Sequence, residues 1–129
     1  MAALDKKILI IEDDRAIRRA MEFRLQKEGF EVITAQDGDE GFTKAGESGL
    51  SLIILDLLLP KLNGFEVLKR LKAGEATKHI PIVVFSNLSQ KTDIDEVKQL
   101  GAAAFFIKSD LSIDLVLENV KKFLNPVVE

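Results

Sequence analysis

Residues 52–64, LIILDLLLPKLNG, combine a run of aliphatic residues with a single aspartate. The aliphatic run from Leu52 to Leu55 predicts a strand that is buried on both faces, as the strands of parallel sheets are. Asp56 follows at once and interrupts the apolar residues. A buried carboxylate is costly unless it is paired or reaches the surface, and the end of a strand allows either. The stretch therefore predicts a buried parallel strand that ends in a charge.

Similar apolar runs recur along the chain, and amphipathic patterns separate them. After the first run, apolar residues fall at helical spacing at Ile17, Met21 and Leu25. Strand and helix alternate over the whole length, which predicts an α/β fold with a doubly wound parallel sheet and right-handed crossovers. The predicted strands are Ile8–Ile11, Val32–Ala35, Leu52–Leu55, Ile82–Phe85 and Ala102–Ile107.

Glycines and small polar residues mark the expected helix ends. Ser112 is expected to cap the start of the last helix, and Thr92 or Asp93 the start of the fourth. The segment between Gln36 and Gly49 is expected to be helical, although the glycines inside it lower its helix propensity. Left-handed glycines are expected to end three helices, at Gly29, Gly74 and Gly101.

The composition is that of one globular domain. The chain has 129 residues, of which 47% are hydrophobic and 30% charged, so it can bury a core without disulfides. We expect a single domain over residues 1–129, with its core at about residues 7–124 and no output domain. The absence of cysteine excludes thiolate metal sites, and a net charge of −3 gives no basic surface for nucleic acid. Asp56 and Pro60 interrupt the longest apolar run, so we expect a cytoplasmic protein without a membrane helix.

Polar residues follow four of the predicted strands. Glu12 and Asp13 follow the first strand, Asp56 ends the third, Ser86 the fourth and Lys108 the fifth. Each has an ordinary interpretation, as a helix cap, a turn residue or a solvated lysine; Asp14, next in the chain, is as well explained as the cap of the first helix. Ligands of open parallel sheets bind at the carboxyl ends of the strands, so the shared placement predicts a site there.

The chemistry of this predicted site is that of phosphoryl transfer. Clustered carboxylates repel and need a cation, and oxygen-only ligands suit Mg²⁺. A carboxylate beside Mg²⁺ is a usable nucleophile toward phosphorus. Lys108 can neutralise charge on a transferred phosphoryl group, and Ser86 can donate a hydrogen bond to it.

These residues lie in motifs that resemble the receiver domain of bacterial two-component response regulators. The motifs are ILIIEDD (8–14), LIILDLLLPKLNGFEVLKRLK (52–72), IPIVVFS (80–86) and GAAAFFIK (101–108). The resemblance covers nearly the whole chain and is to the stand-alone, chemotaxis-type receivers. It implies a flavodoxin-like (βα)5 fold whose parallel sheet has the strand order 2-1-3-4-5.

The resemblance also implies a role for each site residue. Asp56 matches the phosphoacceptor, which receives its phosphoryl group from a sensor histidine kinase or a histidine phosphotransfer protein. Glu12, Asp13, Asp56 and the backbone carbonyl of Leu58 match the residues that hold Mg²⁺, Glu12 through water. Ser86 and Lys108 match the residues that contact the phosphoryl group, and Ser86 and Phe105 also match the switch pair. The implied protein is a signalling phosphoacceptor rather than an enzyme, and its target binds the face formed by the fourth helix, fifth strand and fifth helix.

The loop residues Pro60 and Gly64 match the family as well, and Gly64 is expected to adopt a positive φ. Three other positions depart from the family pattern, and one of them is Phe105, which lacks the hydroxyl of the commoner tyrosine. Ser109 replaces the usual proline after Lys108, so we expect a trans peptide there. Asn87 is larger than the usual residue after Ser86 and is expected to narrow access to Asp56. The two leucines Leu58 and Leu88 offer no polar group to orient a hydrolytic water.

Two other functions compete with a phosphoacceptor. The first is a pseudo-receiver, an adaptor of the same fold that works by contact and is never phosphorylated. The second is a phosphatase with an aspartyl-phosphate intermediate, but such enzymes place a second acid where Leu58 stands. A flavin-binding protein is disfavoured because the first loop offers carboxylates instead of phosphate-binding glycines and hydroxyls.

Overall fold

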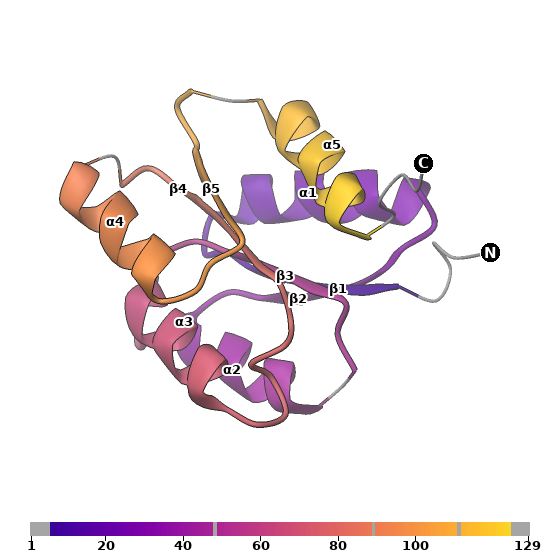
Figure 1. Ribbon diagram of the computed structural model, residues 1–129. Helices are drawn as coiled ribbons and strands as arrows, with labels where there is room; N and C mark the ends of the chain where they lie inside the picture. The colour runs from indigo at the N-terminus through magenta and orange to yellow at the C-terminus, as the bar shows by residue number, and fades with distance from the viewer. Residues whose placement is uncertain (1–5, 48, 89, 111, 125–129) are drawn as a thin grey trace, which may run out of the picture.

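In the part of the chain that the structure describes, residues 6–47, 49–88, 90–110 and 112–124, five parallel strands form one sheet in the order β2-β1-β3-β4-β5 (Figure 1). This computed structural model confirms the expected flavodoxin-like fold and its strand order. The strands are β1 (Lys7–Ile11), β2 (Glu31–Ala35), β3 (Leu52–Leu55), β4 (Ile82–Ser86) and β5 (Ala104–Ile107). The helices are α1 (Arg15–Lys27), α2 (Gly38–Glu47), α3 (Gly64–Ala73), α4 (Lys91–Gln99) and α5 (Ile113–Leu124).

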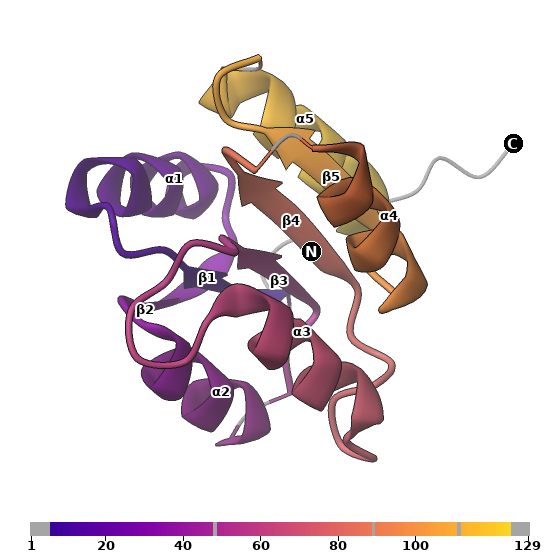
Figure 2. The same cartoon turned by 90° about the vertical axis from the view of Figure 1, so that its left-hand side faces the viewer.

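Helices cover both faces of the sheet and divide the core in two. α1 and α5 pack on one face, and α2, α3 and α4 on the other, as the view in Figure 2 makes plain. Along β1, Ile8 and Ile10 contribute to the first core, whereas Leu9 and Ile11 contribute to the second. β1, β3 and β4 are buried along nearly all their length, which confirms the prediction of strands that are apolar on both faces.

Several predicted element ends need correction. β5 begins at Ala104 instead of residue 102, because the chain first turns through Gly101 at a φ of 102°. α4 begins at Lys91 after Gln90, so neither Thr92 nor Asp93 is its cap. Ser112 does accept a hydrogen bond from the Leu115 N–H at 3.3 Å, as expected of a cap.

Two glycines serve close packing instead of a left-handed turn. Gly74 has a φ of −82°, so the expected left-handed cap is wrong there, whereas Gly29 confirms it at 96°. Gly64 also lacks the positive φ expected of it, which falls on Lys61 at 68°. A Cβ on Gly64 would lie 2.4 Å from the Asp56 carbonyl oxygen. This glycine is therefore needed so that α3 can start directly against the end of β3.

The loop between β3 and α3 rests on the start of α2. The Gly38 N–H donates to the Pro60 carbonyl at 3.3 Å, and a Cβ on Gly38 would lie 1.7 Å from the Leu62 carbonyl oxygen. Beside it, the Asp37 carboxylate accepts the Glu40 N–H at 2.8 Å and lies 3.6 Å from the Lys61 ammonium. α2 thus supports the loop that follows Asp56. None of the helices in the described ranges is long and apolar enough to cross a membrane.

Candidate functional site

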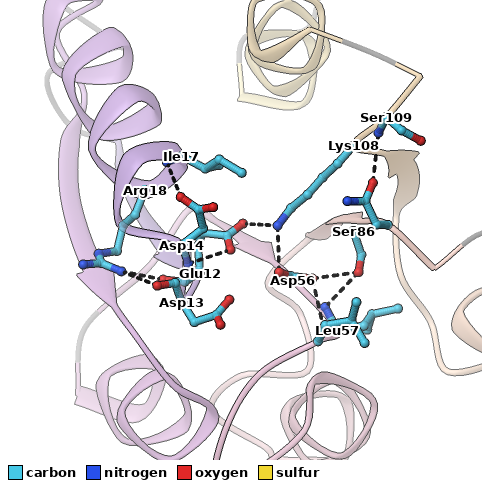
Figure 3. Close-up of polar contacts among 12 residues, drawn as sticks. Glu12, Asp13, Asp14, Ile17, Arg18, Asp56, Leu57, Ser86, Lys108 and Ser109 are labelled. Atoms are coloured by element: carbon cyan, nitrogen blue, oxygen red, sulfur yellow. Dashed lines mark hydrogen bonds and ion pairs between the residues drawn. The ribbon is translucent and has the colours of Figure 1, made fainter.

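The carboxyl ends of four strands bring the predicted residues together. Figure 3 shows Glu12 and Asp13 after β1, Asp56 after β3, Ser86 at the end of β4 and Lys108 after β5, all within one small region. Because the strands are parallel, residues as distant in the sequence as Glu12 and Lys108 reach the same edge of the sheet. The structure thus places these side chains at the carboxyl edge of the sheet.

Both oxygens of the Asp56 carboxylate are engaged. One oxygen, Oδ1, accepts the Ser86 hydroxyl at 2.7 Å and the Leu58 N–H at 3.1 Å. The other, Oδ2, accepts the Lys108 ammonium at 2.8 Å. Asp56 is only 3% exposed, so these partners replace the water that the charge has lost. A buried strand can therefore end in a carboxylate here.

Lys108 neutralises two carboxylates at once. Its ammonium lies 2.7 Å from Glu12 Oε1 and 2.8 Å from Asp56 Oδ2. Burial acts to lower the pKa of Lys108, but hydrogen bonds to Asp56 and Glu12 outweigh it, so the pKa is raised above its ordinary value. Lys108 stays charged at neutral pH and joins the ends of β1, β3 and β5.

Glu12 is an acid of the site whose pKa is shifted by its surroundings. Burial and the neighbouring Asp56 charge raise its pKa to about 7, although the Lys108 hydrogen bond acts in the opposite direction. The Asp14 N–H also donates to its Oε2 at 3.1 Å. One ammonium does not fully compensate the two buried carboxylates, and such a pair accepts either a proton or a further cation.

Asp13 completes a set of carboxylates that fits a divalent cation. One oxygen each from Glu12, Asp13 and Asp56 lie within 4.8 Å of one another. Asp13 is exposed whereas the other two are buried, so a cation could approach from the side of Asp13 and keep some of its water. The oxygen-only donor set and the excess negative charge suit Mg²⁺ or Mn²⁺.

Arg18 holds the backbone that carries these acids, a role that the sequence reasoning missed. Its guanidinium donates to the carbonyl oxygens of Glu12 at 2.8 Å and Asp13 at 3.3 Å (Figure 3). Asp14 caps α1 by accepting the Ile17 N–H at 3.0 Å, which confirms its ordinary interpretation. An arginine one turn into a helix is common, and nothing in the sequence pattern singles out Arg18.

The two expected switch residues differ in burial, and the Ser86 hydroxyl contacts Asp56. Ser86 is fully buried, and its hydroxyl also accepts the Leu57 N–H at 3.4 Å. Phe105 is partly buried and packs against the core on the sheet face that α2, α3 and α4 cover, and Leu88 packs against the same core. Leu58 instead points largely into solvent and is 52% exposed. Leu58 therefore covers little of the core, in contrast to Leu88.

The two positions that depart from the family pattern after Ser86 and Lys108 contact each other. The Ser109 N–H donates to the Asn87 side-chain oxygen at 3.0 Å. No peptide bond is cis within the described ranges, so the expected trans peptide before Ser109 is confirmed. Asn87 is exposed, and its side-chain oxygen is directed to the loop after β5.

Comparison with known proteins identifies a family that matches this chain in sequence and in fold. Residues 8–120 match the family described as the response regulator receiver domain. The chain is 30% identical to the polar-differentiation response regulator DivK of Brucella ovis, over 94% of this chain and 98% of that protein. It is 34% identical over 122 residues to a gliding motility regulatory protein of Myxococcus xanthus, of which it spans only 16%. The Mn²⁺-bound form of response regulator Rcp1 superposes with a TM-score of 0.83 at 30% identity, over 95% of this chain and 97% of that one.

Proposed function

Because the chain belongs to the response regulator receiver domain family, which acts in two-component signalling, we propose that Asp56 is its phosphoacceptor. The phosphoryl donor is a phosphohistidine on a sensor histidine kinase or a histidine phosphotransfer protein. A carboxylate oxygen of Asp56 forms the new bond to phosphorus. The phosphorus–nitrogen bond of the donor breaks, and its electron pair stays on the imidazole nitrogen.

The observation that carries this proposal is the set of contacts around Asp56. Lys108 and Ser86 donate to different oxygens of the carboxylate, at 2.8 Å and 2.7 Å. After transfer, the same ammonium and hydroxyl are placed to donate to the phosphoryl oxygens. Preorganised donors of this kind stabilise the charge that spreads over the phosphoryl group during in-line transfer.

A divalent cation fits beside the same carboxylate. Asp13, Asp56, the Leu58 backbone carbonyl and, through water, Glu12 are the groups that we assign to Mg²⁺. When bound, the cation supplies positive charge next to the phosphoryl oxygens. The raised pKa of Glu12, about 7, supports the assignment because it reflects buried negative charge that a cation would offset.

The output of the switch is a contact with another protein. Ser86 is drawn toward the phosphoryl group, and Phe105 moves into the space beside it. These movements change the surface of α4, β5 and α5, which is where we place the target. The chain thus acts as a signalling phosphoacceptor and not as an enzyme that turns over a separate substrate.

Labelling with a small phosphodonor tests this function. After incubation with acetyl phosphate and Mg²⁺, intact-mass spectrometry should show one phosphoryl adduct that is absent when EDTA is present. Asp56→Asn should abolish the adduct, whereas the matched control Asp110→Asn, at an exposed aspartate after β5, should retain it. If the wild-type protein stayed unlabelled both with acetyl phosphate and with a phosphorylated histidine phosphotransfer protein, the result would contradict the proposal and favour the adaptor.

A further inference from the structure

Two residues that the proposed mechanism does not use follow directly after its two donors. Asn87 comes after Ser86 at the end of β4, and Ser109 comes after Lys108 at the end of β5. The Ser109 N–H donates to Asn87 Oδ1 at 3.0 Å, across 22 positions of sequence. This hydrogen bond therefore links the two loops from which Ser86 and Lys108 reach Asp56; Figure 3 shows it as the contact at Ser109.

The backbone around Lys108 explains why such a link is needed. The Asp110 N–H donates to the Ile107 carbonyl at 3.0 Å, so Lys108 and Ser109 are the two central residues of a tight turn. The Lys108 N–H is bound by the Ser86 carbonyl at 2.9 Å. The N–H of the second central residue has no partner within a turn of this kind. Asn87 supplies that partner, so both central N–H groups of the turn are fastened to the end of β4.

Fastening the turn matters because Lys108 is long and flexible. Its ammonium must lie within hydrogen-bond reach of Glu12 and Asp56 at the same time, at 2.7 Å and 2.8 Å. Four rotatable bonds separate the ammonium from the backbone, and ordering them opposes this geometry. A mobile backbone at the turn would add to the entropy cost of holding the ammonium in place.

We propose that Asn87 is a positioning residue, whose side-chain carbonyl holds the Lys108–Ser109 peptide so that the Lys108 ammonium stays on Asp56 and Glu12. The proposal rests on the proposed function only in giving that ammonium a phosphoryl group to meet. Asn87 and Ser109 form one device, because a proline at 109 would have no N–H for Asn87 to bind.

A double-mutant cycle in the unphosphorylated, Mg²⁺-free protein tests the device. NMR relaxation of the Lys108 side chain reports its order, and amide exchange reports the Ser109 N–H. Asn87→Ala should lower the order of the Lys108 side chain. It should also speed amide exchange at Ser109 by about five-fold, the factor expected for the loss of one hydrogen bond. Asn87→Asp keeps the acceptor oxygen and should retain the wild-type order of the Lys108 side chain. Ser109→Ala keeps the N–H and should retain it as well.

The decisive comparison repeats Asn87→Ala in a Ser109→Pro background. Because that background already lacks the donor, Asn87→Ala should change the order of Lys108 no further. An equal loss in both backgrounds, or a Lys108 side chain that Asn87→Ala leaves ordered, would overturn the positioning role. Acetyl phosphate labelling of the same samples separates the two proposals: unlabelled Asp56 refutes the phosphoacceptor alone, and unchanged Lys108 order refutes the positioning role alone.

Discussion

At the scale of single residues, the site is a problem of charge balance. Glu12 and Asp56 are 1% and 3% exposed, and the ammonium of Lys108 contacts both. Removing one partner of such a buried group leaves the other charges uncompensated, which is why each substitution here should alter its neighbours.

Lys108→Ala should permit phosphorylation of Asp56 but uncouple it from the output face. The ammonium is proposed to bind the transferred group, and Asp56 retains the Ser86 hydroxyl as a partner. Amide NMR before and after acetyl phosphate treatment measures the effect, with Lys78→Ala, an exposed lysine paired with Glu75, as the control. Wild-type shifts around Phe105 in phosphorylated Lys108→Ala would contradict this role.

We propose that single side chains also set the lifetime of a phosphoryl group on Asp56. Leu58 and Leu88, two positions after Asp56 and Ser86, cannot orient a water molecule for in-line attack. We expect slow hydrolysis, and acceleration in the double variant Leu58→Asn and Leu88→Glu by up to about the 10²–10⁴-fold of well-placed polar groups. The rate of hydrolysis is measured as the decay of the phosphoryl adduct in Mg²⁺ after the phosphodonor is removed.

The structure separates the two leucines for this experiment. Leu58 is 52% exposed, so Leu58→Asn should change decay without changing stability, whereas Leu88 packs against the core and its replacement should also destabilise. Leu115→Asn is a matched control, because Leu115 is equally exposed at 52% but lies on α5. Wild-type decay as fast as that of the double variant would rule out the role of the leucines.

At the scale of elements, the β3–α3 loop depends on α2. Gly38→Ala should destabilise the protein and weaken Mg²⁺ binding, because its Cβ would lie 1.7 Å from the Leu62 carbonyl and push away the loop that carries Leu58. Gly46→Ala is the matched control in the same helix, since nothing lies within 4 Å of its Cβ. It should stabilise by about 0.5–1 kcal/mol through helix propensity alone.

Urea unfolding and Mg²⁺ titration of both variants check this dependence. If Gly38→Ala bound Mg²⁺ as tightly as Gly46→Ala does, the start of α2 would have no part in shaping the site. Loss of stability alone, without loss of Mg²⁺ affinity, would assign Gly38 to packing and not to the position of the loop.

Element types could be predicted from the sequence, but two of the expected helix ends could not. At the end of α3, the Thr77 hydroxyl donates to the Leu71 carbonyl at 2.6 Å, so a side chain does the work expected of a left-handed glycine. A Cβ on Gly74 would meet that hydroxyl at 2.7 Å, which explains the glycine by space. At α4, Asp93 lies in the first turn and not before it, where its charge still suits the helix dipole.

At the scale of the whole molecule, cation binding should stabilise the fold by joining strand ends. Mg²⁺ at 100 times its dissociation constant should add about 2.7 kcal/mol to the free energy of unfolding, since the unfolded chain has no such site. Asp13→Ala should remove this gain and abolish phosphorylation, while the apo protein stays folded or becomes more stable as carboxylate repulsion falls.

Thermal unfolding with and without Mg²⁺ measures the gain, and EDTA should reverse it. Asp95→Ala, at an exposed aspartate on α4, is the control for loss of one negative charge. A rise in unfolding temperature with Mg²⁺ that survives in Asp13→Ala, or labelling that persists in EDTA, would contradict the metal role of Asp13.

Strands, helices and the polar residues at the carboxyl edge of the sheet could be predicted from the sequence, because hydrophobic period and strand-end position are local properties of the chain. The pairing of those side chains could not be predicted, because it depends on how distant parts of the chain pack together. The Lys108 ammonium contacts both Glu12 and Asp56, and Asn87 binds the turn that contains Lys108 and Ser109; both arrangements depend on distances across strands. Such distances are fixed by the register and packing of β1, β3, β4 and β5, which no single stretch of the sequence contains.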